Sequence, residues 1–194
     1  MHGNSYRMSH SEHREVCAPG VSEPIYFTKG FRRDIDWVFG GLSREDAELA
    51  AMAFVIPSSA VFYKCMALPK GAMDRARGSV AINSGSREVM EVVARERYAK
   101  NGKSRSVLIH IHPDDCPQLS HCDITTYEND RLRVQSPLGV EKPYPVLLVN
   151  QRESSTPSLL GFWEINGVAY KTEIRCVDDT ASIVKDAWIK AEQV

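Results

Sequence analysis

Two histidines, a serine and an aspartate stand in one short stretch of the chain at spacings that suit metal chemistry. The stretch reads H-x-H over His110 and His112, then seven residues, then S-x-x-D over Ser120 and Asp123. Residues 107–112 are strand formers, and side chains alternate along a strand, so both histidines are expected to face the same side. Ser120 and Asp123 are three residues apart at a predicted helix start and should lie close together. Two imidazoles and a carboxylate make an N, N, O ligand set that suits catalytic zinc, which keeps a fourth position for water.

The same residue types have simpler interpretations. Ser-x-x-Asp before a helix is also a capping box with an acid in place of Glu, and a helix start can be capped and carry a ligand at once. A strand histidine is often an ordinary core or edge residue. A structural zinc site could instead use Cys116, His121 and Cys122, although Pro117 and the adjacent His121 and Cys122 fit the usual ligand spacings poorly.

The elements around this stretch mix strands with helices. Their periodicity predicts an α+β or α/β fold with a mixed sheet between helices. The alanine-rich residues 47–53 are also compatible with a helix, residues 69–78 are predicted to be a loop, and Asn166-Gly167 predicts a hairpin turn. Strands are predicted over 25–27, 49–56, 61–66, 80–82, 107–112, 144–149, 159–165 and 168–177, and helices over 31–39, 84–101, 120–132 and 181–192.

The length, composition and charge of the chain favour one globular domain and argue against nucleic-acid and membrane partners. The length of 194 residues and the 43% of hydrophobic residues suit one core, and we expect an N-terminal extension over 1–24, a domain over 25–178 and a C-terminal helix over 179–194. A net charge of −1 argues against a nucleic-acid partner. The short apolar runs and the lack of a signal-peptide pattern favour a cytoplasmic protein without a membrane partner. Five scattered cysteines predict free thiols.

The pattern H-x-H-P, spacer, S-x-x-D resembles the JAMM motif of the JAB/MPN zinc metalloproteases, and the order of elements is similar over residues 25–178. The resemblance implies a JAB/MPN-like mixed sheet flanked by helices, in a cytidine-deaminase-like three-layer arrangement. It also implies one Zn²⁺ per chain, held by His110, His112 and Asp123, with Ser120 helping to stabilise the oxyanion.

The residue between the two histidines differs from the common form of the motif. Many members of the family have Ser or Thr there, and the DNA-repair type has Asn, whereas this chain has Ile111. Because a strand alternates, Ile111 is expected to point away from the metal and into the core.

The motif of the family also includes an upstream glutamate at the start of an apolar strand. Glu48 fits this position because the apolar run from Leu49 follows it directly, while the rival Glu45 is followed by more polar residues. By resemblance, Glu48 would act as the base that takes a proton from water and delivers it to the leaving amine.

Active members of the family cleave the bond after the C-terminal tail of ubiquitin or a ubiquitin-like protein. The resemblance therefore implies a zinc-dependent isopeptidase or peptidase with a ubiquitin-like protein as substrate, similar to stand-alone prokaryotic members found beside bacterial ubiquitin-like conjugation systems, including defence systems. The alternatives are a zinc peptidase acting on other peptides or on sulfur-carrier proteins, and a catalytically dead scaffold. Dead members usually lose the histidines or the aspartate, which this chain keeps.

Overall fold

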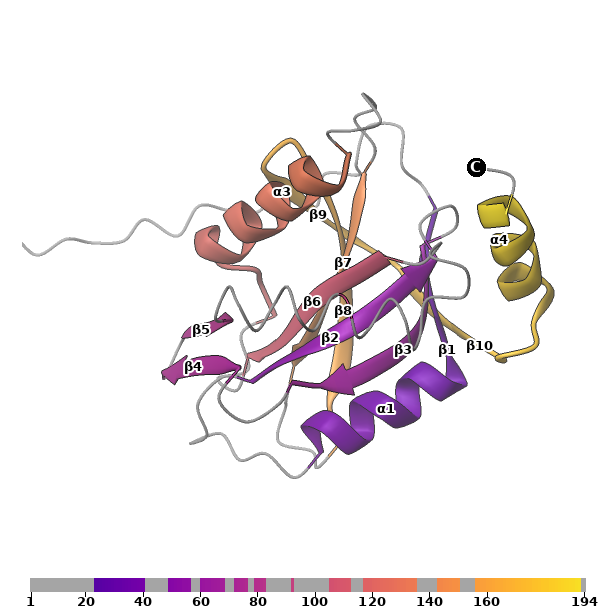
Figure 1. The fold of residues 1–194 in the computed structure, drawn as a ribbon, viewed down its shortest axis with the longest axis horizontal. Helices are drawn as coiled ribbons and strands as arrows, with labels where there is room; N and C mark the ends of the chain where they lie inside the picture. Colours follow the sequence, from indigo (N-terminus) through magenta and orange to yellow (C-terminus); the bar gives the residue numbers. More distant parts are fainter. Residues whose placement is uncertain are drawn as a thin grey trace, which may run out of the picture.

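The computed structural model describes residues 23–40, 49–56, 60–68, 72–76, 79–82, 92, 105–112, 117–135, 143–150 and 156–192 (Figure 1). Within these ranges the elements are β1 (Ile25–Thr28), α1 (Lys29–Phe39), β2 (Ala50–Ile56), β3 (Val61–Ala67), β4 (Met73–Ala76), β5 (Ser79–Ile82), β6 (Arg105–His112), α3 (His121–Gln135), β7 (Tyr144–Asn150), β8 (Ser158–Ile165), β9 (Val168–Thr172), β10 (Ile174–Val177) and α4 (Ser182–Glu192). The mixed α/β class predicted from the sequence is confirmed.

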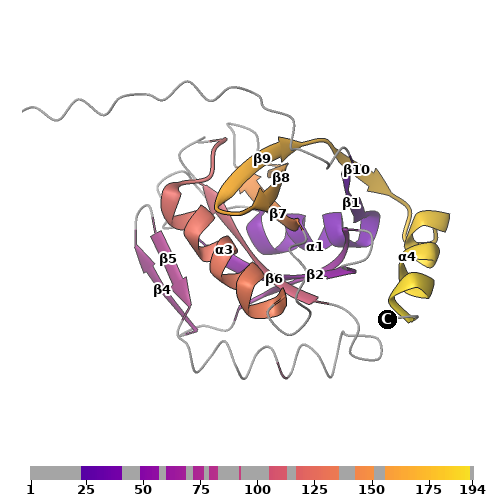
Figure 2. The ribbon, with the colours of Figure 1, turned by 90° about the horizontal axis from the view of Figure 1, so that it is seen from above.

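An eight-stranded mixed sheet forms the framework, in the order β10-β1-β3-β2-β6-β7-β8-β9. The strands at its two ends, β9 and β10, are consecutive in the chain and separated only by Glu173. Residues 168–172 pair with β8 and residues 174–177 pair with β1, so the sheet curls until its ends meet (Figure 2). The prediction of one strand over 168–177 was therefore wrong in detail, because the two halves of this run bind opposite edges of the sheet.

The alanine-rich segment is the strand β2 and not a helix. It pairs antiparallel with both β3 and β6, and every residue from Ala50 to Ile56 is buried. One face, with Ala51 and Ala53, belongs to the main core, and the other, with Met52 and Phe54, belongs to a second apolar cluster. Tertiary burial on both faces thus overrides the helix propensity of alanine.

Helix α1 covers the concave side of the curled sheet. Its N-cap is Thr28, whose side chain accepts a hydrogen bond from Phe31 N at 3.1 Å, and Phe31, Ile35 and Phe39 are fully buried in the main core. Asp34 ties the helix to β3 by accepting hydrogen bonds from the Lys64 ammonium and from a backbone N–H of that strand. The buried face of helix α4 packs against Ile56 at the end of β2 and Val61 at the start of β3.

One prediction of secondary structure is wrong, and another lies outside the described residues. Residues 69–78 were expected to be a loop, but β4 occupies 73–76 and pairs with β5. The adjacent charged residues Asp74 and Arg75 leave β4 without the apolar alternation that predicts a strand. The predicted helix over 84–101 lies outside the described residues except at position 92, and so do residues 1–22. None of the described helices is long and apolar enough to cross a membrane.

Candidate metal centre

The C-terminal end of β6 presents the two histidines on one face, as strand alternation predicts. His110 and His112 are both buried, and their Nε2 atoms lie 2.8 Å apart. Ile111 points to the opposite face and belongs to the main core. The neighbour of His110 in the ladder is Ala50 of β2, and this small side chain leaves the imidazole room on that face.

The start of α3 is a reciprocal capping box. The Ser120 hydroxyl oxygen accepts a hydrogen bond from Asp123 N at 3.1 Å, and the Asp123 carboxylate accepts one from Ser120 N at 2.7 Å. The Ser120 carbonyl accepts the first helical bond, from Ile124 N. The cap predicted from Ser-x-x-Asp is thus present, and it fixes the carboxylate at the end of the helix where a negative charge is favoured.

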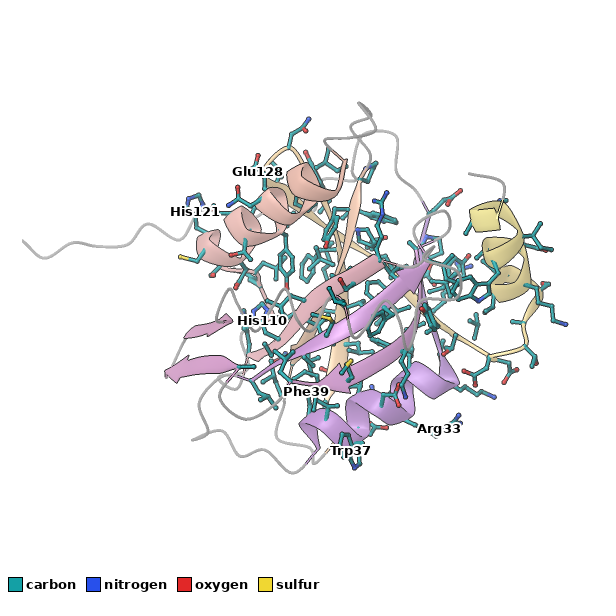
Figure 3. The ribbon with its side chains drawn as sticks, viewed as in Figure 1. Arg33, Trp37, Phe39, His110, His121 and Glu128 are labelled. Atoms are coloured by element: carbon teal, nitrogen blue, oxygen red, sulfur yellow. The ribbon has the colours of Figure 1, made fainter. Side chains whose placement is uncertain are left out.

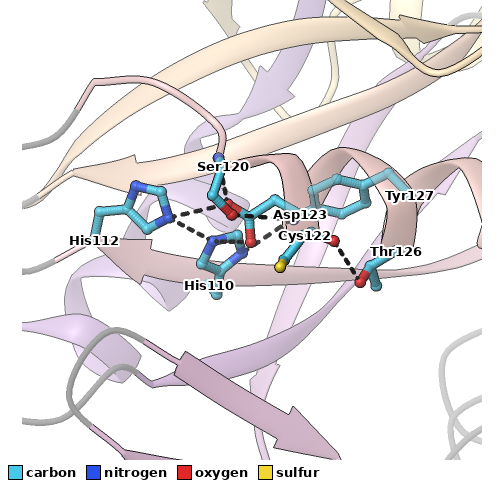
Figure 4. A network of polar contacts seen from close by, with 7 residues as sticks. All are labelled: His110, His112, Ser120, Cys122, Asp123, Thr126 and Tyr127. Atoms are coloured by element: carbon cyan, nitrogen blue, oxygen red, sulfur yellow. Dashed lines mark hydrogen bonds and ion pairs between the residues drawn. The ribbon is translucent and has the colours of Figure 1, made fainter. Parts of the chain in front are cut away.

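The cap and the strand end bring three ligand groups together (Figure 4). Oδ1 of Asp123 lies 3.2 Å from Nε2 of His110, and Oδ2 lies 3.4 Å from Nε2 of His112. Burial alone would raise the pKa of the Asp123 carboxyl, but the hydrogen bonds from the two imidazoles outweigh it and hold this pKa well below its ordinary value. The carboxylate is therefore charged at neutral pH.

The spacing of these donor atoms fits a single small metal ion. One ligand atom from each of the three residues lies within 4.8 Å of the others. Two ligands bound at about 2.0–2.1 Å to a tetrahedral zinc are separated by about 3.3 Å. The two imidazole Nε2 atoms lie 2.8 Å apart, and each lies 3.2 or 3.4 Å from a different oxygen of the Asp123 carboxylate. The His-His-Asp group can thus hold one metal ion.

The rival ligand set is not assembled in the part of the chain that the structure describes. Its members His121 and Cys122 are exposed on α3, and the His121 ring projects away from His110 (Figure 3). Cys116 lies outside the described residues. Among described side chains, His110, His112 and Asp123 are the one group of three or more histidines, cysteines or acids that could hold a metal.

One residue of the site was missed by the sequence analysis. Tyr127 lies one helical turn after Asp123 on α3 and is 2% exposed, and its hydroxyl oxygen lies 3.1 Å from Nδ1 of His110. The spacing i, i+4 places both side chains on one face of the helix, which is the signal that could have found it.

The predicted base and its rival, Glu48 and Glu45, both lie outside the described residues. The described neighbour is Leu49, whose carbonyl accepts a hydrogen bond from Ile111 N at 3.0 Å. The apolar strand that follows Glu48 in the sequence is therefore hydrogen-bonded to the strand that carries the histidines.

Comparison with known proteins bears on the fold alone. No model of a known protein family and no curated protein matches the chain. Among solved structures, the chain is similar to the solution structure of protein DSY2949 from Desulfitobacterium hafniense, with 16% sequence identity and a TM-score of 0.51, over 79% of this chain and 93% of that one. The chain thus shares a mixed α/β fold with that protein and carries a His-His-Asp group able to hold one metal ion.

Proposed function

We propose that this protein is a zinc-dependent isopeptidase or peptidase of the JAMM type, which hydrolyses the bond after the C-terminal tail of a ubiquitin-like protein. The observation that carries the proposal is the meeting of His110, His112 and Asp123 at a strand end, with Ser120 capping the adjoining helix. The curled mixed sheet with helices on it supports the proposed JAB/MPN arrangement. The proposed metal is zinc because an N, N, O set from two histidines and a carboxylate is one of its catalytic ligand sets.

Ser120 is the proposed oxyanion donor. Its hydroxyl oxygen accepts a hydrogen bond from Asp123 N, and its hydroxyl also bonds the Asp123 carboxylate, so its proton would turn from that carboxylate to the substrate carbonyl. The side chain is exposed, so a substrate carbonyl can reach it. Its position beside the Asp123 ligand supports the proposed role, since the proposed reaction would develop negative charge on a carbonyl oxygen close to the metal.

Glu48 is the proposed general base. In the sequence it stands two positions before Ala50, the ladder partner of His110, and directly before the apolar run from Leu49, whereas Glu45 stands five positions before Ala50. A bound zinc ion supplies Lewis-acid polarisation and lowers the pKa of water toward neutrality. The glutamate takes the proton that water loses and passes it to the leaving amine.

The test is a panel of ubiquitin-like proteins fused through their C-terminal tails to a reporter, alongside cell-wall peptides and sulfur-carrier fusions, each with and without a chelator. We expect chelator-sensitive cleavage directly after a ubiquitin-like tail. Glu48→Gln should keep its zinc and lose hydrolysis, while Glu173→Gln, which changes an exposed glutamate between β9 and β10, should behave like the wild type. Full activity of Glu48→Gln would refute the assigned base, and a zinc-loaded protein that cleaves no ubiquitin-like fusion would refute the proposed substrate.

A further inference from the structure

His110 has a polar partner at each ring nitrogen. Its Nε2 faces Asp123 and His112, while its Nδ1 lies 3.1 Å from the hydroxyl oxygen of Tyr127. The two rings lie at 25° with their centroids 6.3 Å apart, so the phenol reaches the imidazole along the edge that carries Nδ1. Figure 4 shows Tyr127 on the helix face that also carries Asp123.

We propose that Tyr127 is a positioning residue for the metal, whose hydroxyl accepts the Nδ1–H that His110 must carry when its Nε2 lone pair holds the ion. The inference rests on the metal site of the proposed function. It adds a residue that touches neither substrate nor metal and acts through His110.

The argument starts from the proton of a neutral imidazole, which sits on one ring nitrogen only. Metal binding at Nε2 needs the lone pair there, so the proton must be on Nδ1, where it can be donated to the Tyr127 oxygen. Without metal, an Nε2–H can instead be donated to the Asp123 carboxylate, and the Tyr127 hydroxyl can donate to Nδ1. A hydroxyl both donates and accepts, so it serves both states, whereas a carboxylate or a backbone carbonyl could only accept.

Burial makes this partner hard to replace. Tyr127 is 2% exposed and His110 is 4% exposed, so the gap left by a missing hydroxyl is poorly accessible to water. Tyr127→Phe keeps the buried ring but leaves the Nδ1–H unpaired whenever metal is bound. Partners of this kind change metal affinity by about 10–100-fold when they are removed.

The experiment measures zinc affinity of the full chain by competition with a chromophoric chelator, for the wild type, Tyr127→Phe and Tyr170→Phe. Tyr170 is a matched control because it is a half-buried tyrosine on β9, which pairs with β8 and not with β6. We expect Tyr127→Phe to bind zinc about 10–100-fold more weakly, and Tyr170→Phe to bind within twofold of the wild type. The imidazole ¹⁵N spectrum of the zinc-loaded wild type should show a protonated Nδ1 in His110 whose proton exchanges slowly, and that exchange should accelerate in Tyr127→Phe.

The outcomes separate this inference from the proposed function. Equal zinc affinity of Tyr127→Phe and Tyr170→Phe would overturn the role of Tyr127 even if the protein cleaves ubiquitin-like fusions. Weakened zinc binding in Tyr127→Phe with no cleavage of any fusion would support the positioning role and refute the proposed substrate. Equal loss of zinc affinity in both tyrosine variants would indicate a general packing effect and contradict the inference, and a wild type that binds no zinc would overturn both.

Discussion

Replacing Asp123 with Asn separates the two roles of this side chain. The carboxylate caps α3 by accepting from Ser120 N at 2.7 Å, and it faces Nε2 of His110 at 3.2 Å and Nε2 of His112 at 3.4 Å. An amide oxygen can still accept the bond from Ser120 N, so the expected cost of the weakened cap is about 0.5–1 kcal/mol. The amide carries no negative charge and is a poor ligand for zinc.

The effect on zinc binding should be much larger than the effect on the cap. Loss of an outer-shell partner weakens metal binding by about 10–100-fold, so loss of one of three ligands should exceed about 100-fold, or about 2.7 kcal/mol. The assay is a chelator competition with Asp186→Asn, an exposed aspartate of α4, as the control. An Asp123→Asn protein that binds zinc as tightly as Asp186→Asn would refute the assignment of the ligand.

In the metal-free protein, the same substitution can be tested through the pH dependence of folding stability. Although burial opposes it, the hydrogen bonds from His110 and His112 hold the pKa of Asp123 below its ordinary value of 3.8, so the folded state binds fewer protons at this site than the unfolded chain. The stabilising contribution of the carboxylate is therefore complete above about pH 4 and is lost as the pH falls toward the lower folded-state pKa. In chelator, the stability difference between wild type and Asp123→Asn should shrink as the pH is lowered from 5 to 2 in urea unfolding, and a difference that grows would contradict this reasoning.

Three further substitutions test the site and its framework. Ser120→Ala should bind zinc nearly as tightly as the wild type but cleave a fusion substrate about 10²–10³-fold more slowly, and unchanged cleavage would remove the oxyanion role. Gly161→Ala would place a Cβ in steric conflict with Ile174 Cγ2, where β8 packs against β10, so urea unfolding should show a loss of about 1–3 kcal/mol; unchanged stability would argue against this close packing. Asp34→Ala removes the acceptor for Lys64 Nζ at 2.9 Å and for a strand N–H, and should cost about 1.5–3 kcal/mol in the same assay, whereas wild-type stability would show that this tie between α1 and β3 is unimportant.

The ligand cluster was predictable because its geometry is local. Strand alternation placed His110 and His112 on one face, and the spacing of a capping box placed Asp123 beside Ser120. The loop between the strand and the helix did not need to be known in detail, because the end of one element and the start of the next come together in the curled fold.

Two of the missed features depend on how elements pack together, and a third was missed for a local reason. The break at Glu173 exists because β9 pairs with β8 and β10 with β1, and no local pattern encodes that change of partner. The i, i+4 spacing of Tyr127 from Asp123 indicates a shared helix face, but its bond to His110 depends on the way α3 packs against the end of β6. The strand β4 was missed because its sequence, Met-Asp-Arg-Ala, has two adjacent charged residues and no apolar alternation.

The most direct test of the account is anomalous diffraction at the zinc edge from crystals of the full chain grown with zinc. The account predicts one anomalous peak per chain, at about 2.0–2.2 Å from His110 Nε2, His112 Nε2 and a carboxylate oxygen of Asp123. Two results would contradict the account: no peak at these residues in crystals of protein that carries one zinc ion per chain, or a peak within ligand distance of Cys116, His121 and Cys122 instead.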